Sequence, residues 1–296
     1  CLETWKQTLP HHPAGGRLVR YLWELVGHNA EQLRLDYQAC PGPRGARPAL
    51  AVVGPAELLL IDPTAQIDPM VVADTTHGPV VIDREAVVTA FSRLEGPCYV
   101  GPATHVLGAK IRAGTTLGPN CRVGGEVEAS ILQGFSNKYH DGFLGHSYVG
   151  EWVNLGAGTN NSDLRNDYGE VTVTVDGRPV PTGRTKVGCF LGDHTKTGLG
   201  TLLNTGTSVG VFCNLLPSGG LLPKHVPSFL NWWNGAVADN ADLPRLLRTA
   251  GEVMRRRGCA LTEVQAALYR QLFEQSAAAR RQAVREAVAR RLRRSA

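Results

Sequence analysis

The fold class of this chain follows from the run Ser136-Asn-Lys-Tyr-His-Asp-Gly-Phe-Leu-Gly-His-Ser-Tyr-Val-Gly-Glu-Trp-Val-Asn-Leu-Gly-Ala-Gly158. Phe143, Val149 and Leu155 are spaced six residues apart in it, and a glycine follows the second and the third. This beat is typical of a hexapeptide solenoid, in which each short strand points an aliphatic side chain into a stacked core and a glycine permits the corner. The run also holds polar side chains that the beat does not require, and these are the first candidates for chemistry: Lys138, His140, Asp141 and Asn154.

The same spacing extends on both sides of this run. It recurs before it at Ile61 and Ile67, at Val100 and Val106, and at Ile111, Leu117 and Val123. After it, the beat resumes at Val187 and continues through Asp193, Leu199, Thr205 and Val211. Asp193 and Thr205 are then polar residues at inward positions, which is costly unless they are hydrogen-bonded or face a partner subunit. We expect Trp232 and Trp233 to pack over the open end of the solenoid.

The beat is interrupted between residues 159 and 186. This segment contains Glu170-Val-Thr-Val-Thr-Val175, which alternates as a strand does, followed by the turn signal Asp176-Gly177. We therefore predict that residues 159–186 leave the solenoid as a β-hairpin arm.

Both ends of the chain have helical patterns. Residues 1–49 are predicted to form a helical segment and a linker, with an amphipathic stripe of Leu18, Tyr21, Leu22, Leu25 and Val26. Residues 50–235 are the predicted solenoid, and residues 236–296 a C-terminal helical region whose last helix starts at Thr262. The predicted fold class is mainly β: a parallel β-helix of hexapeptide repeats with α-helical N- and C-terminal segments.

Composition limits the cellular setting. The chain has 296 residues, of which 43% are hydrophobic, and no run of 18 apolar residues or signal segment is present, so we expect no membrane span and no secretion. Seven scattered cysteines without C-x-x-C spacing favour the reducing cytoplasm. A chain that starts at Cys1 instead of Met reads as part of a longer protein.

The net charge of +5 is concentrated at one end. Seven arginines lie between Arg280 and Arg294, with Glu286 as the one acidic residue among them. No aromatic stacking residues or nucleic-acid motif accompany them, so this pattern favours a solvated helix end and makes nucleic acid unlikely as a partner. A scaffold that binds nucleic acid through this tail stays an alternative, and it would show strongly salt-dependent binding.

Several short motifs in order resemble the GlmU-like sugar nucleotidyltransferase family. They are Ser136-Asn-Lys, His140-Asp-Gly-Phe-Leu-Gly145, Gly150-Glu-Trp, Asn154-Leu-Gly, Thr159-Asn-Asn-Ser, Gly192-Asp-His, Asn204-Thr-Gly-Thr and Pro227-Ser-Phe229. The resemblance covers roughly residues 50–235 and the Tyr21-Leu-Trp-Glu-Leu25 helix. It implies a left-handed parallel β-helix of the acetyltransferase type and a homotrimer. The family's N-terminal nucleotidyltransferase domain has no counterpart here, so any uridylyl transfer would belong to a segment absent from this chain.

The resemblance also implies roles for two residues of the central run, and the chemistry of the lysine side chain suggests a role for a third. His140 matches the family's catalytic histidine, and a near-neutral imidazole suits a general base that takes the proton of an attacking amine. Asn154 matches a substrate-binding asparagine, and Lys138 would hold a sugar phosphate as a point charge. The structural alternatives are a corner histidine bonded to a carbonyl, an amide ladder along the solenoid, and a solvated lysine.

Two positions depart from the family pattern. Phe143, a candidate substrate contact, stands where the family has a tyrosine, and Glu128 stands where it has a lysine. Both changes remove contacts expected for a sugar phosphate.

Further candidates complete the predicted site. Asp193, His194 and Thr205 are candidates for contact with acetyl-CoA, since the resemblance places the acyl carrier in the cleft between subunits. Asn160 and Asn161, at the root of the arm, either shape a sugar pocket or serve as turn and capping residues. No metal site is expected, because the histidines lack close paired spacing: His105, His146, His194 and His225.

The sequence therefore carries two hypotheses of function. The first is acetyl transfer from acetyl-CoA to an amino-sugar 1-phosphate, with His140 as base. The alternative is a non-catalytic trimerisation or regulatory module of a sugar-1-phosphate nucleotidyltransferase whose catalytic domain is absent from this chain.

Overall fold

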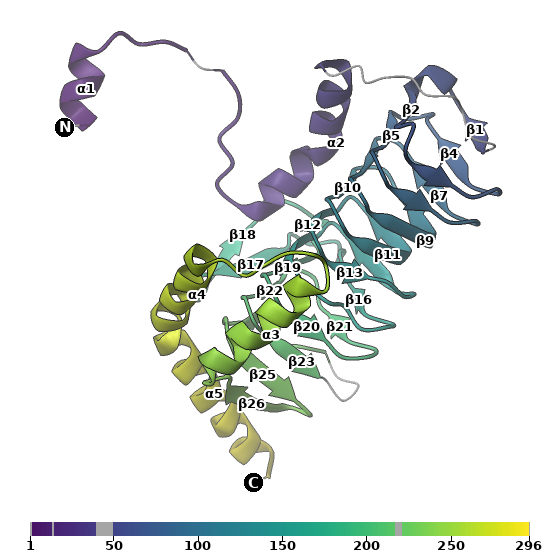
Figure 1. Cartoon of the computed structure of the whole chain (residues 1–296). Helices are drawn as coiled ribbons and strands as arrows, with labels where there is room; N and C mark the ends of the chain where they lie inside the picture. The colour runs from purple at the N-terminus through teal and green to yellow at the C-terminus, as the bar shows by residue number, and fades with distance from the viewer. Residues whose placement is uncertain (1, 14, 40–49, 217–220, 296) are drawn as a thin grey trace.

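The computed structural model describes residues 2–13, 15–39, 50–216 and 221–295. Within them the chain winds into a parallel β-solenoid, which helices flank at both ends (Figure 1). The fold class predicted from the sequence, a parallel β-helix with helical ends, is confirmed.

Three faces of short strands build the solenoid. One face is β2 (Leu59–Ile61), β5 (Val80–Ile82), β8 (Cys98–Val100), β10 (Thr115–Leu117), β12 (Ile131–Gly134), β15 (Tyr148–Glu151), β19 (Cys189–Leu191), β22 (Thr207–Val209) and β24 (His225–Val226). A second sheet contains β1 (Ala51–Val53), β3 (Gln66–Ile67), β4 (Val72–Asp74), β6 (Val87–Val88), β7 (Arg93–Glu95), β9 (His105–Ile111), β11 (Arg122–Glu128), β13 (Asn137–Lys138) and β14 (Phe143–Gly145). The long strands β9 and β11 bend around a corner, so this sheet spans two faces of the prism.

Further strands continue the stack toward the C-terminus. They are β16 (Asn160–Asn161) with β21 (Leu202–Leu203), and β20 (Lys196–Thr197), β23 (Asn214–Leu216), β25 (Leu230–Trp233) and β26 (Ala236–Asp239). β26 pairs antiparallel with β25 and so ends the winding of the solenoid.

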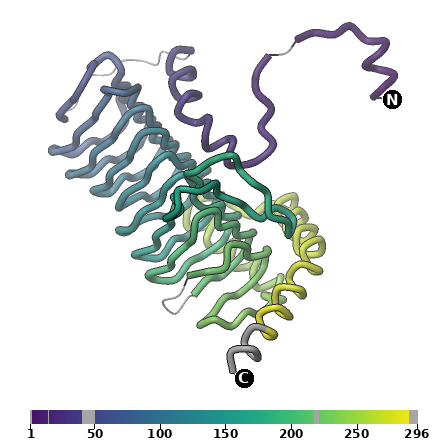
Figure 2. Tube along the Cα trace, turned by 180° about the vertical axis from the view of Figure 1, so that it is seen from behind, coloured from purple at the N-terminus to yellow at the C-terminus, as the bar shows by residue number. Residues whose placement is uncertain are grey.

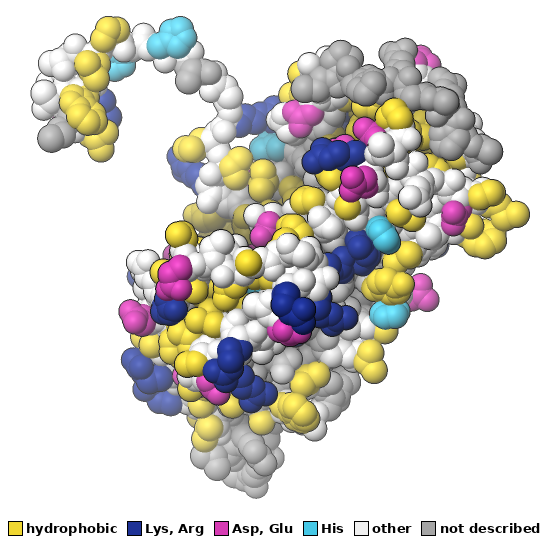
Figure 3. All heavy atoms as spheres, in the orientation of Figure 1, with side chains coloured by type: hydrophobic (Ala, Val, Ile, Leu, Met, Phe, Trp, Pro, Cys, Tyr) yellow, Lys and Arg dark blue, Asp and Glu magenta, His cyan; other side chains and the backbone are white. Residues whose placement is uncertain are grey.

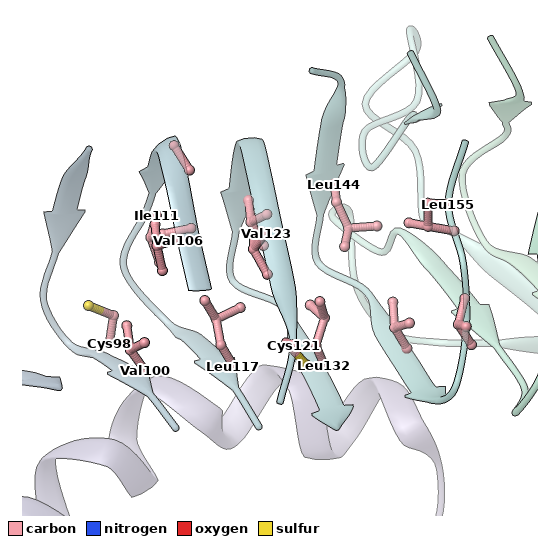
Figure 4. Close-up of a cluster of buried hydrophobic side chains, with 14 of the residues drawn as sticks. Cys98, Val100, Val106, Ile111, Leu117, Cys121, Val123, Leu132, Leu144 and Leu155 are labelled. Atoms are coloured by element: carbon pink, nitrogen blue, oxygen red, sulfur yellow. The ribbon is translucent and has the colours of Figure 1, made fainter. Parts of the chain in front are cut away.

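The core lies inside the coils, where stacked aliphatic side chains point at one another (Figure 4). Val106, Val123, Ile111 and Leu117 are fully buried, as the beat predicts. At the central run the inward residue is Leu144, whereas Phe143 is half-buried on the outside of the coil. The sequence assignment of Phe143 to the core was thus one residue off.

The inward positions after the arm also differ from the prediction. The side chains that point inward are Leu191, Thr197, Leu203, Val209 and Leu215. The first four lie two residues before the predicted positions Asp193, Leu199, Thr205 and Val211. Val187 itself lies at a corner, where its N–H bonds the carbonyl of Asp163. The chain therefore re-enters the solenoid at a different point of the hexapeptide than the sequence suggested.

A hairpin projects from the solenoid between β16 and β19. β17 (Thr172–Val175) pairs antiparallel with β18 (Arg178–Pro181) across Asp176 and Gly177. Both turn residues have positive φ, which is the backbone of a type I′ turn. Figure 2 shows this arm crossing beside the start of the N-terminal helix α2.

Helix α2 (Leu22–Ala39) lies along the face that contains β8, β10 and β15. Trp23 and Val26 are its buried side chains, and Trp23 packs with Val173 and Phe190. Leu18, Leu22 and Leu25 are exposed, so the predicted stripe was wrong for them. The short helix α1 (Leu2–Thr8) buries no residue.

Three C-terminal helices cover one corner of the solenoid: α3 (Leu243–Arg255), α4 (Glu263–Gln275) and α5 (Ala277–Ser295). Thr262 caps α4, and its side chain and that of Gln265 form a reciprocal capping box, as the sequence predicted for the start of a helix. Trp232 packs against the core, but Trp233 is exposed, so only the first of the two tryptophans closes the end as predicted.

The corner under these helices is lined by aromatic rings. Phe135, Trp152, His194, Phe212 and Phe229 come from successive coils, and each has a φ between +52° and +60°. Neighbouring rings stack along the column, with centroid separations from 4.3 to 6.2 Å. This aromatic column is the surface that the C-terminal helices bury.

Candidate functional site

The corner that carries His140 is longer than the corner of the preceding coil. Lys138 pairs with Val123 and Phe143 with Glu126, so the chain uses five steps here where the coil before it uses three. The extra residues bulge outward, and Tyr139, His140 and Asp141 are all exposed. His140 therefore lies at a solenoid corner, and its role as a general base stays a prediction.

Lys138 lies inside the coil rather than on its surface. Its side chain is 2% exposed and occupies the inward position that Val123 fills one coil earlier. Its ammonium donates to the carbonyl oxygens of Gly124 (3.1 Å) and His140 (2.6 Å). Burial lowers the pKa of this lysine to about 8, against the opposing effect of Asp141. Lys138 is therefore neither a solvated charge nor an open contact for a phosphate, which corrects both expectations for it.

Asn154 belongs to a polar ladder on the outside of the solenoid. It forms β-bridges with Asn137 in one neighbouring coil and with Lys196 in the next, and its Oδ1 accepts a hydrogen bond from Asn137 Nδ2 at 3.2 Å. The side chain is exposed on the strand position next to the His140 corner. These contacts are those of the amide ladder, and the exposed face of Asn154 stays open to a ligand.

Asn160 and Asn161 bond to the backbone of the preceding coil. Asn160 Oδ1 accepts from the N–H of Phe143 at 2.7 Å. Asn161 is buried, and its amide both accepts from the N–H of Gly145 (2.8 Å) and donates to its carbonyl (3.0 Å). Both asparagines thus lie in strand β16, not in a turn or a helix cap as the structural alternative had it, and they fix the position of β14.

A histidine–aspartate pair at the root of the arm was missed by the sequence analysis. His146 Nδ1 lies 2.7 Å from Asp163 Oδ2, and both side chains are largely buried. Burial acts to raise the pKa of Asp163, but the hydrogen bond and charge of His146, with Lys186, lower it overall. Asp163 ends the polar tract Asn160-Asn161-Ser162-Asp163 at the root of the arm, and that tract was the one available signal of the pair.

Two cationic side chains lie close to the carboxylate of Glu128. Its carboxylate oxygens lie 3.9 Å from Lys186 Nζ and 3.9 Å from Arg112 Nε, and its carbonyl accepts the N–H of His146. Glu128 therefore helps to hold the corner of His146 where a phosphate-binding lysine was expected from the family pattern.

Asp193 is a corner residue whose carboxylate accepts a hydrogen bond from a backbone N–H. Its Oδ1 accepts from the N–H of Glu151 at 2.9 Å, and burial raises its pKa. Thr205 is also buried, bonding to Ser162 and Asn204 at the start of the arm. Neither residue is at the inward position that the sequence had assigned to it, and both are hydrogen-bonded within the chain.

His194 lies in the aromatic column, not in an open cleft. It is 2% exposed, stacks on Phe212 at 4.6 Å, and meets the edge of Tyr269 from α4 at 5.4 Å. Among the residues that the structure describes, neither ring nitrogen has a hydrogen-bond partner. Burial, with the charge of Lys196, lowers its pKa to about 3, so the ring is neutral at ordinary pH. Direct contact of His194 with an acyl carrier would require α4 to move, which corrects the prediction of an open cofactor site.

Two global features bear on the kind of site present. In the described part of the chain, no group of three or more His, Cys, Asp and Glu side chains is arranged to hold a metal ion. None of the helices there is long and apolar enough to cross a membrane.

Sequence comparison relates part of the chain to bifunctional enzymes. A bifunctional sugar-1-phosphate nucleotidylyltransferase/acetyltransferase from Sulfurisphaera tokodaii is 37% identical over 92 residues, which are 31% of this chain and 23% of that protein. The bifunctional protein GlmU of Gloeothece citriformis is 32% identical over 146 residues, or 48% and 27% of the two chains. GlmU of Azorhizobium caulinodans is 28% identical over 185 residues, or 58% and 38%. The chain thus spans well under half the length of these relatives.

Solved structures give weaker likenesses. LpxA from Acinetobacter baumannii matches with a TM-score of 0.30 and 10% identity, over 69% of this chain and 78% of that one. An acetyltransferase of Bacillus cereus matches with a TM-score of 0.29 and 14% identity, over 78% and 97% of the two chains. No family model matches the chain. On the strength of the sequence relatives, this chain is a hexapeptide β-helix protein with partial homology to the bifunctional GlmU and sugar-1-phosphate nucleotidylyltransferase/acetyltransferase proteins.

Proposed function

We propose that this chain is a sugar-phosphate acyltransferase that transfers the acetyl group of acetyl-CoA to the amine of an amino-sugar 1-phosphate. The observation that carries the proposal is the His140 corner: a bulge that exposes an imidazole three residues after Asn137, the residue that Asn154 pairs with, in a chain related to acetyltransferases. A solenoid has no need of a longer corner here, because the preceding coil turns with two residues fewer.

The proposed reaction assigns one step to each group. The amine nitrogen attacks the thioester carbonyl carbon, and the imidazole of His140 takes the proton that the amine loses. The C–S bond then breaks, and that proton goes to the departing thiolate of CoA. Asn154 presents an amide that orients the sugar through hydrogen bonds to its hydroxyl groups. We further propose a homotrimer, acting in the cytoplasm, in which a neighbouring subunit completes the binding site for acetyl-CoA.

The test is release of free CoA thiol from acetyl-CoA in the presence of glucosamine 1-phosphate. We expect turnover by the wild type and a loss of about 100-fold or more in His140→Ala, the usual scale for removal of a general base. His12→Ala is the control, because His12 is exposed near the N-terminus, far from the solenoid corner in sequence. Absence of turnover by the wild type, or equal rates for the two variants, would remove the proposal.

A second candidate is the non-catalytic trimerisation or regulatory module. The contacts of Glu128 favour it, because Arg112 and Lys186 engage its carboxylate where a lysine for a sugar phosphate was expected. This candidate predicts a trimer by analytical ultracentrifugation without thiol release under any of the conditions above. It also predicts that His140→Ala leaves the oligomeric state unchanged.

A further inference from the structure

A column of polar and basic residues runs along the outside of the solenoid. Strand pairing places His105, Arg122, Asn137, Asn154 and Lys196 at the same position of successive coils. Asn214 and Asn231 continue the column. Neighbouring strands of a sheet are about 4.8 Å apart, so Arg122 and Lys196 are separated by roughly 14 Å along the column. We call the part from Arg122 to Lys196 the cationic ladder.

The C-terminal helices add one more cation to it. Arg257 follows α3, and its guanidinium donates to Asn137 Oδ1 at 3.0 Å and reaches the carbonyl of Asn120 at 3.5 Å. Figure 3 shows Lys and Arg side chains gathered on this face, near the end of α3 that Figure 1 shows in front of the solenoid. Residues more than a hundred positions apart in sequence thus meet at Asn137.

The three cations of this surface are partnered by neutral groups. Arg122 donates to the carbonyls of Ala103 (3.0 Å) and Cys121 (2.9 Å), and Lys196 to the carbonyl of His194 (3.3 Å). None of the three, Arg257 included, forms an ion pair with a carboxylate in the described residues, although all three are half-buried. Some other cations of this solenoid do form ion pairs, as Arg93 does with Asp74 and Glu95.

Leaving these charges together has an electrostatic cost. Burial and the neighbouring charge of Arg257 lower the pKa of Arg122, and burial, Arg122 and Arg257 lower that of His105. Like charges in a partly desolvated setting repel each other. An anion placed between the two guanidinium groups would attract both, and this attraction would offset the repulsion between them. Paired guanidinium groups match the geometry of a phosphate, and the neighbouring asparagine amides suit neutral hydroxyl groups.

We propose that the cationic ladder binds a phosphate ester, with its phosphoryl group between Arg122 and Arg257 and the rest of the ligand extending over Asn137 and Asn154 toward Lys196. This inference rests on the proposed function for the identity of the ester, which is either the sugar 1-phosphate or the phosphates of CoA. It assigns the phosphate to residues outside the central run, in place of the buried Lys138.

Binding is tested on the full chain by isothermal titration with inorganic phosphate, glucosamine 1-phosphate and CoA in separate experiments. Arg257→Gln should weaken binding of at least one phosphate ester by about tenfold or more, the scale of a lost charged hydrogen bond. Arg256→Gln is the matched control. Arg256 directly precedes Arg257, but its side chain is exposed and makes no contact with the ladder among the described interactions. The phosphate affinity of Arg256→Gln should stay within about twofold of the wild-type value, which is the expectation for a solvent-exposed charge that salt screens.

The outcomes separate the ladder from the proposed activity. Selective weakening of glucosamine 1-phosphate or of CoA identifies which substrate supplies the phosphoryl group, and binding that depends on Arg257 without any turnover keeps the ladder while the proposed function falls. Turnover whose KM values for both substrates are unchanged in Arg257→Gln overturns the ladder and keeps the function. No binding of any of the three probes by the wild type, or equal weakening in both variants, also overturns it. A thermal midpoint matching wild type shows that the variants are folded.

Discussion

The ammonium of Lys138 lies 2.6 Å from the carbonyl oxygen of His140. This contact ties the exposed corner to the interior of the coil, since the same ammonium also bonds Gly124. The corner of His140 is therefore held from inside, by a charge at a position that Val123 fills in the preceding coil.

Replacing this lysine by methionine tests the energetic consequence. The pKa of Lys138 is about 8 in the folded protein, against 10.5 for the free side chain. Because folding lowers the pKa of Lys138, folding is least favourable when the lysine is protonated in both the folded and the unfolded protein. This destabilisation is fully present below pH 8 and disappears as the pH rises to 10.5. Relative to Lys138→Met, the wild type should gain about 3 kcal/mol of unfolding free energy between pH 8 and 10.5.

Urea denaturation of both proteins at several pH values measures this difference. Val123→Met is the control for side-chain volume, and its difference from wild type should not change over the same interval. A flat difference for Lys138→Met would show that this lysine is not held in the interior.

The buried histidine of the aromatic column provides a second test. Both ring nitrogens of His194 lack hydrogen-bond partners in the described part of the chain, so His194→Phe should stabilise the protein by about 1–3 kcal/mol, the cost of unsatisfied buried polar groups. The folded pKa of His194 is about 3 and the reference value 6.5, so wild-type stability is lost as pH falls from 6.5 toward 3. The advantage of the phenylalanine variant should therefore grow over that interval.

Thermal and urea midpoints at pH 7 and pH 5 check this. Phe212→Ala is a contrasting variant, because it opens the same column and should cost about 3–5 kcal/mol. A loss of stability in His194→Phe at pH 7 would indicate that the imidazole makes an interaction that this structure lacks.

The pair of His146 and Asp163 should anchor the root of the arm. Asp163→Asn removes the charge that accepts from His146, and we expect a loss of about 1–2 kcal/mol at pH 7. Because folding lowers the pKa of Asp163, its contribution is present above the unfolded pKa near 4 and is lost as pH falls through the folded value. The difference from wild type should therefore shrink in acid.

Hydrogen exchange of residues 164–186, the part of the arm that follows Asp163, gives a local measurement of the same effect. Asp176→Asn at the exposed hairpin turn is the control and should leave protection at the arm's root unchanged. Equal exchange in Asp163→Asn and wild type would argue against an anchoring role.

Arg280 differs from Arg281 and Arg285, whose side chains are exposed. It is 3% exposed, pairs with Asp239 at 2.9 Å, and lies 3.9 Å from the ring centre of Phe273. The charge pattern predicted a solvated basic tail here, which is wrong for Arg280. Arg280→Met should destabilise the protein by about 3 kcal/mol, because it leaves Asp239 unpaired. Arg281→Met, at the adjacent exposed position, should change the unfolding free energy by less than about 0.5 kcal/mol in the same denaturation experiment.

The six-residue beat was sufficient to predict the solenoid, because aliphatic side chains must point inward once in each short strand. At two places, however, it did not predict correctly which residue of the strand points inward. Leu144 replaces Phe143 in the core after the bulged corner, and Leu191 replaces Asp193 after the arm. In both cases extra residues precede the error, and their path depends on contacts with the neighbouring coil, which a hydrophobic pattern does not contain.

The candidate site was predictable to a similar degree. His140 and Asn154 stand out from the beat because they are polar where no polar residue is needed. The burial of Lys138 could not be read from the same pattern, since a lysine normally marks a surface position. Asp163 and Arg257 contact residues that are distant in sequence, His146 and Asn137, and these contacts form only in the folded protein. The local sequence therefore gives little indication of their roles.

The arm also shows how tolerant the winding is of interruption. Ser147 bonds the N–H of Cys189, 42 residues later, in the same way that Ser130 bonds the N–H of Ser147, 17 residues later. The rung-to-rung bond is thus preserved across a detour, because the chain leaves and returns at one corner. That corner is a natural insertion point: a guest peptide whose ends lie equally close could replace the hairpin, which would make this protein a scaffold for displaying foreign loops.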